Sequence, residues 1–151
     1  WEREGYVYYT PGDVCDYNYI KQKIREIGEL YDLRIVAYDR WNASQIVIDL
    51  TEEGCPMIPV GQGYKTMSPA TKEFEGLVLS GKLRHGGNPV LRWMMSNVVL
   101  THDAAANVKP DKAKSNEKID GIVATIMALS EAMQNKNTGG SAYDDKEIFF
   151  L

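Results

Sequence analysis

Two carboxylates stand where an α/β protein could bring them together for metal chemistry. Asp39 directly follows the apolar run "IVAY" at residues 35–38, which is typical of a strand covered on both faces. Asp120 lies near the start of an apolar segment that predicts a helix over about residues 117–133. Sites in open α/β sheets lie beyond the carboxyl ends of the strands, and Asp39 is at such an end. Carboxylate oxygens are hard ligands that suit Mg²⁺ or Mn²⁺.

The predicted final helix carries a wide apolar face, and Asp120 shares part of it. A buried carboxylate without a partner is costly, so Asp120 needs a metal ion, a cation or the amides of the helix N-terminus. Glu117 lies three residues earlier and can share the helix face and the site. Two divalent ions about 4 Å apart can activate water and stabilise the leaving oxygen in phosphodiester hydrolysis. The apolar positions form two adjacent stripes, Ile119, Ile122, Ile126, Leu129 and Met133 in one, and Val123 and Met127 beside Asp120 in the other.

Each of these acids also has an interpretation that involves no metal. Asp39 can be a turn or helix-capping residue paired with Arg40. Asp120 can simply interact with the helix dipole, and Glu117 can be a solvated residue of the first turn. The pattern of residues alone leaves these interpretations open.

A group of lysines leads directly into the predicted final helix. A cationic strip beside a metal site could hold a DNA backbone, and Arg40 beside Asp39 could add to it. The alternative is an ordinary solvated loop. The segment "GQGYK" is not a phosphate-binding loop, because no Walker spacing occurs anywhere in the chain. The lysines are Lys109, Lys112, Lys114 and Lys118.

Length and composition are those of one ordinary globular domain. The chain has 151 residues, of which 44% are hydrophobic and 25% charged, and its net charge of −4 gives no global basic signature of nucleic-acid binding. No apolar run approaches the roughly 20 residues that span a bilayer, so no membrane partner is expected. Cys15 and Cys55 form no C-x-x-C motif, which favours two thiols in a reducing compartment.

Strands and helices are predicted to alternate, which indicates an α/β fold with parallel pairing between residues 33–38 and 57–60. Asp16 is expected to cap the first helix, and Ser68 with Pro69 to start the third, after a loop at residues 61–67. From residue 135 the chain becomes polar and glycine-rich, which predicts a disordered tail ending in "IFFL". The remaining expected elements are a strand at residues 6–10, a helix capped by Asn42 or Ser44 and closed by Gly54, a helix at residues 89–97 and a strand at residues 98–102.

Three segments resemble the C-terminal nuclease domain of the large terminase subunit of tailed bacteriophages and prophages. They are "IVAYDRWNASQIV", "VGQGYKTMSPATKEFEGLVLSGKLRHGGNPVLRWMMSNVV" and "KPDKAKSNEKIDGIVATIMAL". The resemblance covers about residues 5–133, and it implies an RNase H-like mixed sheet flanked by helices. It also implies a metal-dependent endonuclease that cuts concatemeric viral DNA during packaging. Asp39 falls at the family's second acidic motif and Asp120 at its third.

Further expectations come from the same resemblance. It implies Mg²⁺ or Mn²⁺, two ions in the complete domain, with Asp39, Asp120 and Glu117 as ligands. Double-stranded DNA, the portal protein and the small terminase subunit are the implied partners, in the cytoplasm of a bacterial host. The nuclease domain would occupy residues 1–134, followed by the disordered tail at 135–151.

The resemblance also departs from the family's pattern. The family's first metal-binding Asp, on a central strand, and its Walker ATPase lie upstream of the matched region. We therefore expect a sheet that is incomplete on its N-terminal side. A second copy, residues 6–10 or the terminal "IFFL" would cover the open edge of the strand at 33–38. Activity of the chain by itself stays open. The competing hypotheses are a non-catalytic module that contacts portal or capsid, and another RNase H-like phosphoryl-transfer enzyme.

Overall fold

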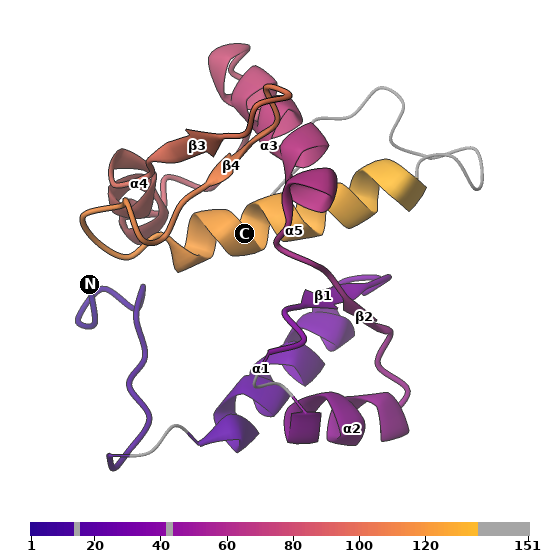
Figure 1. The fold of residues 1–151 in the computed structure, drawn as a ribbon. Coiled ribbons are helices and arrows are strands. Elements are labelled where there is room, and N and C mark those ends of the chain that lie inside the picture. The colour runs from indigo at the N-terminus through magenta and orange to yellow at the C-terminus, as the bar shows by residue number, and fades with distance from the viewer. Residues whose placement is uncertain (14–15, 42–43, 136–151) are drawn as a thin grey trace. The chain divides into compact units, whose positions relative to one another are not determined.

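The computed structural model describes residues 1–13, 16–41 and 44–135. The chain divides into two compact units, a first unit of Trp1–Val60 and a second unit of Gly61–Leu151. None of the helices in the described ranges is long and apolar enough to cross a membrane. The elements, labelled in Figure 1, are α1 (Tyr17–Leu30), β1 (Val36–Tyr38), α2 (Ser44–Glu52), β2 (Met57–Pro59), α3 (Tyr64–Leu79), α4 (Pro89–Ser96), β3 (Leu100–His102), β4 (Val108–Pro110) and α5 (Asp120–Asn135).

A short parallel strand pair forms the centre of the first unit. β1 pairs with β2 in the register Val36 with Met57, Ala37 with Ile58 and Tyr38 with Pro59, which confirms the predicted parallel pairing. The amide of Val60 donates to the carbonyl of Tyr38 at 2.8 Å and extends the pair by one residue. Within the described part of the chain, no further strand joins this sheet. The edge of β1 that faces away from β2 is therefore unpaired within the described residues, in agreement with the expected incomplete sheet.

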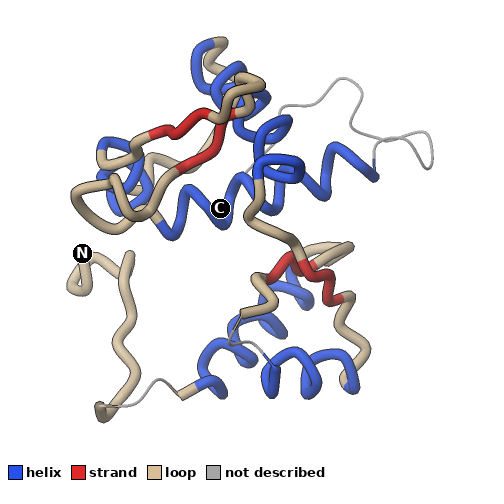
Figure 2. Tube along the Cα trace, viewed as in Figure 1, coloured by secondary structure: helices blue, strands red, loops and turns tan. Residues whose placement is uncertain are grey.

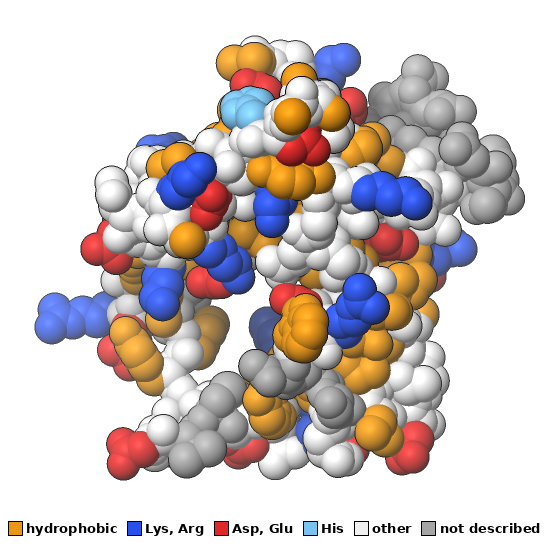
Figure 3. All heavy atoms as spheres, viewed as in Figure 1, with side chains coloured by type: hydrophobic (Ala, Val, Ile, Leu, Met, Phe, Trp, Pro, Cys, Tyr) orange, Lys and Arg blue, Asp and Glu red, His pale blue; other side chains and the backbone are white. Residues whose placement is uncertain are grey.

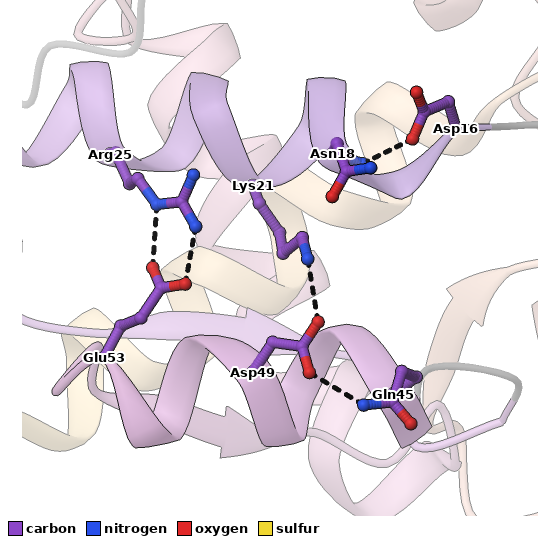
Figure 4. Close-up of polar contacts among 7 residues, drawn as sticks. All are labelled: Asp16, Asn18, Lys21, Arg25, Gln45, Asp49 and Glu53. Atoms are coloured by element: carbon purple, nitrogen blue, oxygen red, sulfur yellow. Dashed lines mark hydrogen bonds and ion pairs between the residues drawn. The ribbon is translucent and has the colours of Figure 1, made fainter.

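Two helices accompany this strand pair, and polar contacts join them (Figure 4). The Asp16 side chain accepts a hydrogen bond from the amide of Asn18 at 2.9 Å, which confirms the predicted cap of α1. Lys21 of α1 pairs with Asp49 of α2 at 2.8 Å, and Arg25 binds Glu53 through two nitrogens. α1 buries no residue completely.

The second unit is built around α5 (Figures 1 and 2). Both α3 and α4 pack against α5, and β4 packs against α3. β3 and β4 form an antiparallel pair in which Thr101 lies opposite Lys109. The apolar stripes predicted for the last helix are therefore largely confirmed as core. The buried apolar side chains of this unit are Met67, Ala70, Phe74, Val108, Ile119, Ile122, Val123, Ile126, Met127 and Leu129.

The strand predicted at residues 6–10 is wrong, because this segment is irregular in the structure. Tyr8 and Tyr9 are 80% and 73% exposed. Strand propensity largely reflects packing against neighbouring strands and burial on one face. Neither is present for these tyrosines, so their residue types alone do not produce a strand.

Three predicted boundaries in the second unit also need correction. α3 begins at Tyr64, inside the predicted loop, and Pro69 lies within the helix. The hydroxyl of Ser68 does not cap a helix, because it is buried and accepts a hydrogen bond from the amide of Val108 at 3.0 Å. The predicted basic loop contains β4, and α5 begins at Asp120, so Glu117 precedes the helix.

Some predictions fall on residues outside the described ranges. The tail predicted at 135–151 falls outside the described ranges except for Asn135, which is the last residue of α5. The predicted capping role of Asn42 and the predicted thiol of Cys15 also fall outside the described ranges. Cys55 is a free thiol. The single nuclease domain over residues 1–134 stays a prediction.

Candidate functional site

Asp39 follows the last residue of β1, as predicted, and is partly buried. Its Oδ1 accepts a hydrogen bond from the amide of Trp41 at 3.2 Å. This contact is an Asx-type turn, so the Asp39 carboxylate helps to shape the turn that follows the strand. A carboxylate has further acceptor positions, so this turn is compatible with metal binding.

Asp120 is the first residue of α5, and its side chain is 60% exposed. The expectation that it lies on the buried face is wrong, because its neighbours Ile119 and Val123 take the buried positions. Lys112 donates to Oδ1 of Asp120 at 2.7 Å. This hydrogen bond, with the charges of Lys112 and Lys118, holds the pKa of the Asp120 carboxyl below its ordinary value, while partial burial opposes the shift. Asp120 is therefore ionised at neutral pH, as a metal ligand must be.

Glu117 is exposed and lies in the turn before α5. The helical spacing that was expected to place it beside Asp120 does not apply there, because the helix has not yet begun. Its role as a ligand stays a prediction that now depends on the path of this turn. Across the described ranges, no three side chains of the His, Cys, Asp and Glu types gather closely enough to hold a metal ion.

The two candidate ligands belong to different units, Asp39 to the first and Asp120 to the second. The fold of each unit positions its own carboxylate at an element end, as the sequence predicts. Neither unit by itself tests whether the two carboxylates meet. Their shared role in metal binding stays a prediction.

The four candidate DNA-binding lysines differ in their surroundings. Lys109 is half-buried in β4, where its Nζ donates to the carbonyl of Gln62 at 3.1 Å and lies 5.4 Å from the centre of the Tyr64 ring. Both contacts favour a structural role for this ammonium group. Lys114 donates to Thr101 Oγ1 at 3.1 Å and is nevertheless exposed. Lys112 and Lys118 are exposed as well.

The predicted basic strip is therefore not a uniform solvated loop. On the face of the molecule shown in Figure 3, Lys and Arg side chains lie beside Asp and Glu side chains. Arg40 is exposed beside Asp39 in the first unit. DNA binding by Arg40 and the lysines stays a prediction.

Gly121, the residue after Asp120, lies close to α4 in a contact that the apolar pattern of the helix did not predict. A Cβ atom at this position would lie 2.8 Å from both Leu91 Cδ2 and Met94 Sδ of α4. The absence of a side chain therefore allows α4 to cross the first turn of α5 closely. A glycine within an otherwise apolar helix is the sequence signal that could have indicated such an approach.

Comparison with known proteins identifies the terminase nuclease family, which the sequence motifs resemble, over most of the chain. The family model described as "Terminase large subunit, endonuclease domain" matches residues 3–136. The "Terminase, large subunit" of Enterobacteria phage HK97 is 40% identical over 147 residues, which are 96% of this chain and 29% of that protein. "Protein YmfN" of Escherichia coli (strain K12) is 33% identical over 135 residues, which are 88% of this chain and 30% of that protein. The chain thus spans less than a third of these relatives.

A solved structure supports the fold. The crystal structure of the HK97 bacteriophage large terminase matches with a TM-score of 0.79 and 41% identity, over 87% of this chain and 28% of that chain. This match confirms the predicted fold class, an α/β, RNase H-like arrangement of small mixed sheets and flanking helices.

Proposed function

Since this chain belongs to the endonuclease-domain family of terminase large subunits, we propose that it is the metal-dependent endonuclease part of such a subunit. In this role it cuts concatemeric viral DNA during genome packaging. The observation that carries the proposal is the family match over residues 3–136, which includes both Asp39 and Asp120. Each of these acids stands at an element end, one after β1 and the other at the start of α5.

Asp39 and Asp120 are the residues proposed to hold Mg²⁺ or Mn²⁺, with Glu117 as a further ligand. The donor set fits such ions, because carboxylate oxygens are their preferred ligands and Asp120 is already ionised at neutral pH. When bound, the ions supply an activated water and stabilise the leaving oxygen of the phosphodiester. Asp39 contributes from a turn fixed by its own hydrogen bond to Trp41.

Lys112 has a second role in this proposal. Its ammonium group neutralises Asp120 when no metal is bound, at a distance of 2.7 Å. With a divalent ion on the same carboxylate, the Lys112 ammonium group would be available for a DNA phosphate. Lys114, Lys118 and Arg40 are exposed and provide further phosphate contacts. Lys109 is the weakest of the predicted contacts, because its ammonium group already has partners within the second unit.

The proposed partners follow from membership in the family. They are double-stranded DNA, the portal protein and the small terminase subunit, in the cytoplasm of a bacterial host. Self-association is proposed through the edge of β1 that no strand covers within the described ranges.

Plasmid nicking in Mn²⁺ or Mg²⁺ tests the proposed function, with this chain and with a version extended at its N-terminus. We expect Asp39→Asn and Asp120→Asn each to lower the nicking rate by roughly 100-fold or more, since each removes a ligand. Asp32→Asn and Glu131→Gln are matched controls that remove a carboxylate from the same two units, and both should cut normally. Near-normal nicking by Asp39→Asn or Asp120→Asn would exclude that residue as a ligand.

The alternative for this chain alone is a non-catalytic module that contacts portal or capsid. This alternative predicts that neither the chain nor its extended version nicks DNA, although both bind a portal or capsid protein. The family match favours a terminase over another RNase H-like phosphoryl-transfer enzyme.

A further inference from the structure

An exposed tryptophan stands beside the first candidate metal ligand. Trp41 follows Asp39 by two residues, and it is 79% exposed. Its amide donates to Oδ1 of Asp39 at 3.2 Å, so one Asx-type turn holds both residues at the carboxyl end of β1. A single exposed apolar side chain is ordinary on a protein surface. The informative feature is therefore the position of this ring next to Asp39.

The turn keeps the tryptophan within reach of DNA bound at the proposed metal site. Residues two positions apart are separated by at most roughly 7 Å between their Cα atoms, and a turn shortens this distance. Successive base steps of duplex DNA are about 3.4 Å apart along the helix axis. A phosphate bound by an ion on Asp39 would therefore bring the neighbouring base steps within reach of the Trp41 indole.

The residue between Asp39 and Trp41 favours a nucleic acid as the partner of this surface. Arg40 is exposed, and its guanidinium group suits a phosphate. Exposed aromatic rings beside cationic side chains are the combination with which proteins bind bases and backbone together. A protein partner could also bind a tryptophan and an arginine, but it would cover the carboxylate that a nuclease has to present to DNA.

We propose that Trp41 is a DNA-contacting residue that stacks on a base next to the phosphate held at Asp39. The bases of an intact duplex are already stacked on one another, so the ring must open a base step as an apolar wedge. A wedge favours DNA that is mismatched at this step, because less energy is needed to unstack it. The inference rests on the proposed nuclease function and names the part of the substrate that Trp41 contacts.

DNA affinity at several salt concentrations tests this proposal in the full chain. The buffer contains EDTA, so that binding is measured without cutting, and the probe is a short duplex with or without a single mismatched pair. Trp41→Ala should lower the affinity by roughly 5-fold to 100-fold, because it removes a stacking contact, and should leave the salt slope unchanged. Arg40→Ala should instead reduce the salt slope by about one unit, because it removes a phosphate contact.

Two further variants separate stacking by Trp41 from an effect on the fold. Trp41→Phe keeps an aromatic ring and should retain most of the affinity. The matched control Tyr8→Ala removes a ring that is 80% exposed in the same unit and should bind DNA as the wild type does. A preference for the mismatched duplex should be present in the wild type and in Trp41→Phe, and it should be lost in Trp41→Ala.

A second measurement follows the ring itself, by fluorine NMR of the chain labelled with fluorotryptophan. Addition of the mismatched duplex should shift the Trp41 signal saturably, whereas the signal of Trp93, in α4 of the second unit, should move less. A Trp41 signal that moves with protein concentration and not with DNA would overturn the proposal, because the ring would then lie between two copies of the chain.

The outcomes separate the role of Trp41 from the proposed nuclease function. Equal DNA affinity of Trp41→Ala and the wild type would overturn the role of Trp41 and leave the nuclease proposal intact. A loss of salt slope in Trp41→Ala would also overturn it, because the variant would then act through Arg40. So would an equal loss of affinity in Tyr8→Ala. Failure of both the wild-type chain and its N-terminally extended version to bind DNA would overturn both proposals.

Discussion

In the second unit α3 and α5 meet through fully buried side chains such as Phe74, Ile126 and Leu129, whereas in the first unit α1 buries none of its residues. Two ion pairs connect α1 to α2 instead, Lys21 with Asp49 and Arg25 with Glu53 (Figure 4). Exposed ion pairs contribute little stability compared with buried apolar surface. The two candidate ligands therefore stand on scaffolds of different strength. Asp120 lies on a packed core, whereas Leu50 and Val60 are the only fully buried apolar side chains among the described residues of the unit that carries Asp39.

This difference matters for a site that needs both carboxylates. Regions with few buried apolar contacts open more readily than packed cores. We expect the first unit to unfold locally more readily than the second when the pH or the denaturant concentration changes. The position of Asp39, more than that of Asp120, should then limit the assembly of a metal site.

The largest effect is expected from removing a core side chain of the second unit. Leu129→Ala should lower the free energy of unfolding by about 2–5 kcal/mol, because Leu129 is only 1% exposed. Leu30→Ala is the matched change in α1, where the side chain is 76% exposed, and it should cost less than about 0.5 kcal/mol. Urea unfolding followed by circular dichroism measures both. Equal losses would contradict the contrast between the units.

A pair of glycine substitutions tests how tightly α5 is packed. Gly121→Ala places a Cβ within 2.8 Å of Leu91 and Met94, and such overpacking should cost about 1–3 kcal/mol. Gly76→Ala in α3 meets nothing within 4 Å and should instead stabilise by up to about 1 kcal/mol. Thermal unfolding of the two variants compares them. If Gly121→Ala stabilised the chain as much as Gly76→Ala, the crossing of α4 and α5 would be looser than described.

The smallest effect concerns the ion pairs of the first unit and their dependence on pH. Hydrogen bonds from Lys21 and Gln45 lower the pKa of Asp49, and the hydrogen bond from Arg25 lowers the pKa of Glu53. Because both pKa values are lower in the folded state, these pairs add stability above the ordinary carboxyl pKa of about 4 and lose it as the pH falls through the lowered values.

Amide hydrogen-exchange protection at pH 6 and near pH 3 measures this effect. The amides of α1 should lose protection at the lower pH, and those in the middle of α5 should change less, since apolar packing holds that helix. The variant Asp49→Asn/Glu53→Gln should show little change in α1 between the two pH values. A pH response of α1 that persisted in this variant would mean that other groups cause it.

Sequence patterns predicted the local elements well where the pattern of apolar residues or a capping residue determines the structure. The cap at Asp16, the parallel pairing of β1 with β2 and the buried stripe of α5 are of this kind. The start of α3 was mispredicted, because Ser68 bonds to the amide of Val108, which lies 40 positions away in the chain. The local sequence around Ser68 cannot predict a hydrogen bond to a residue so distant in the chain.

The candidate site was predictable to the same extent. The sequence placed Asp39 at a strand end and Asp120 at a helix start, and the structure agrees. It did not predict that Asp120 is exposed and paired with Lys112, because periodicity does not separate the edge of an apolar face from its centre. Whether the two carboxylates meet depends on contacts between distant parts of the chain, which no local pattern encodes.

The most direct test of the central claim is a Mn²⁺ titration followed by NMR, since a bound Mn²⁺ ion broadens the signals of nearby nuclei. At less than one equivalent we expect broadening around both Asp39 and Asp120, and Asp39→Asn should remove it at both places. Asp39→Asn also tests whether the two carboxylates share one ion. If they bound separate ions, this variant would lose the broadening only around residue 39. Broadening confined to one carboxylate, or broadening around Asp120 that survives in Asp39→Asn, would contradict a shared metal site.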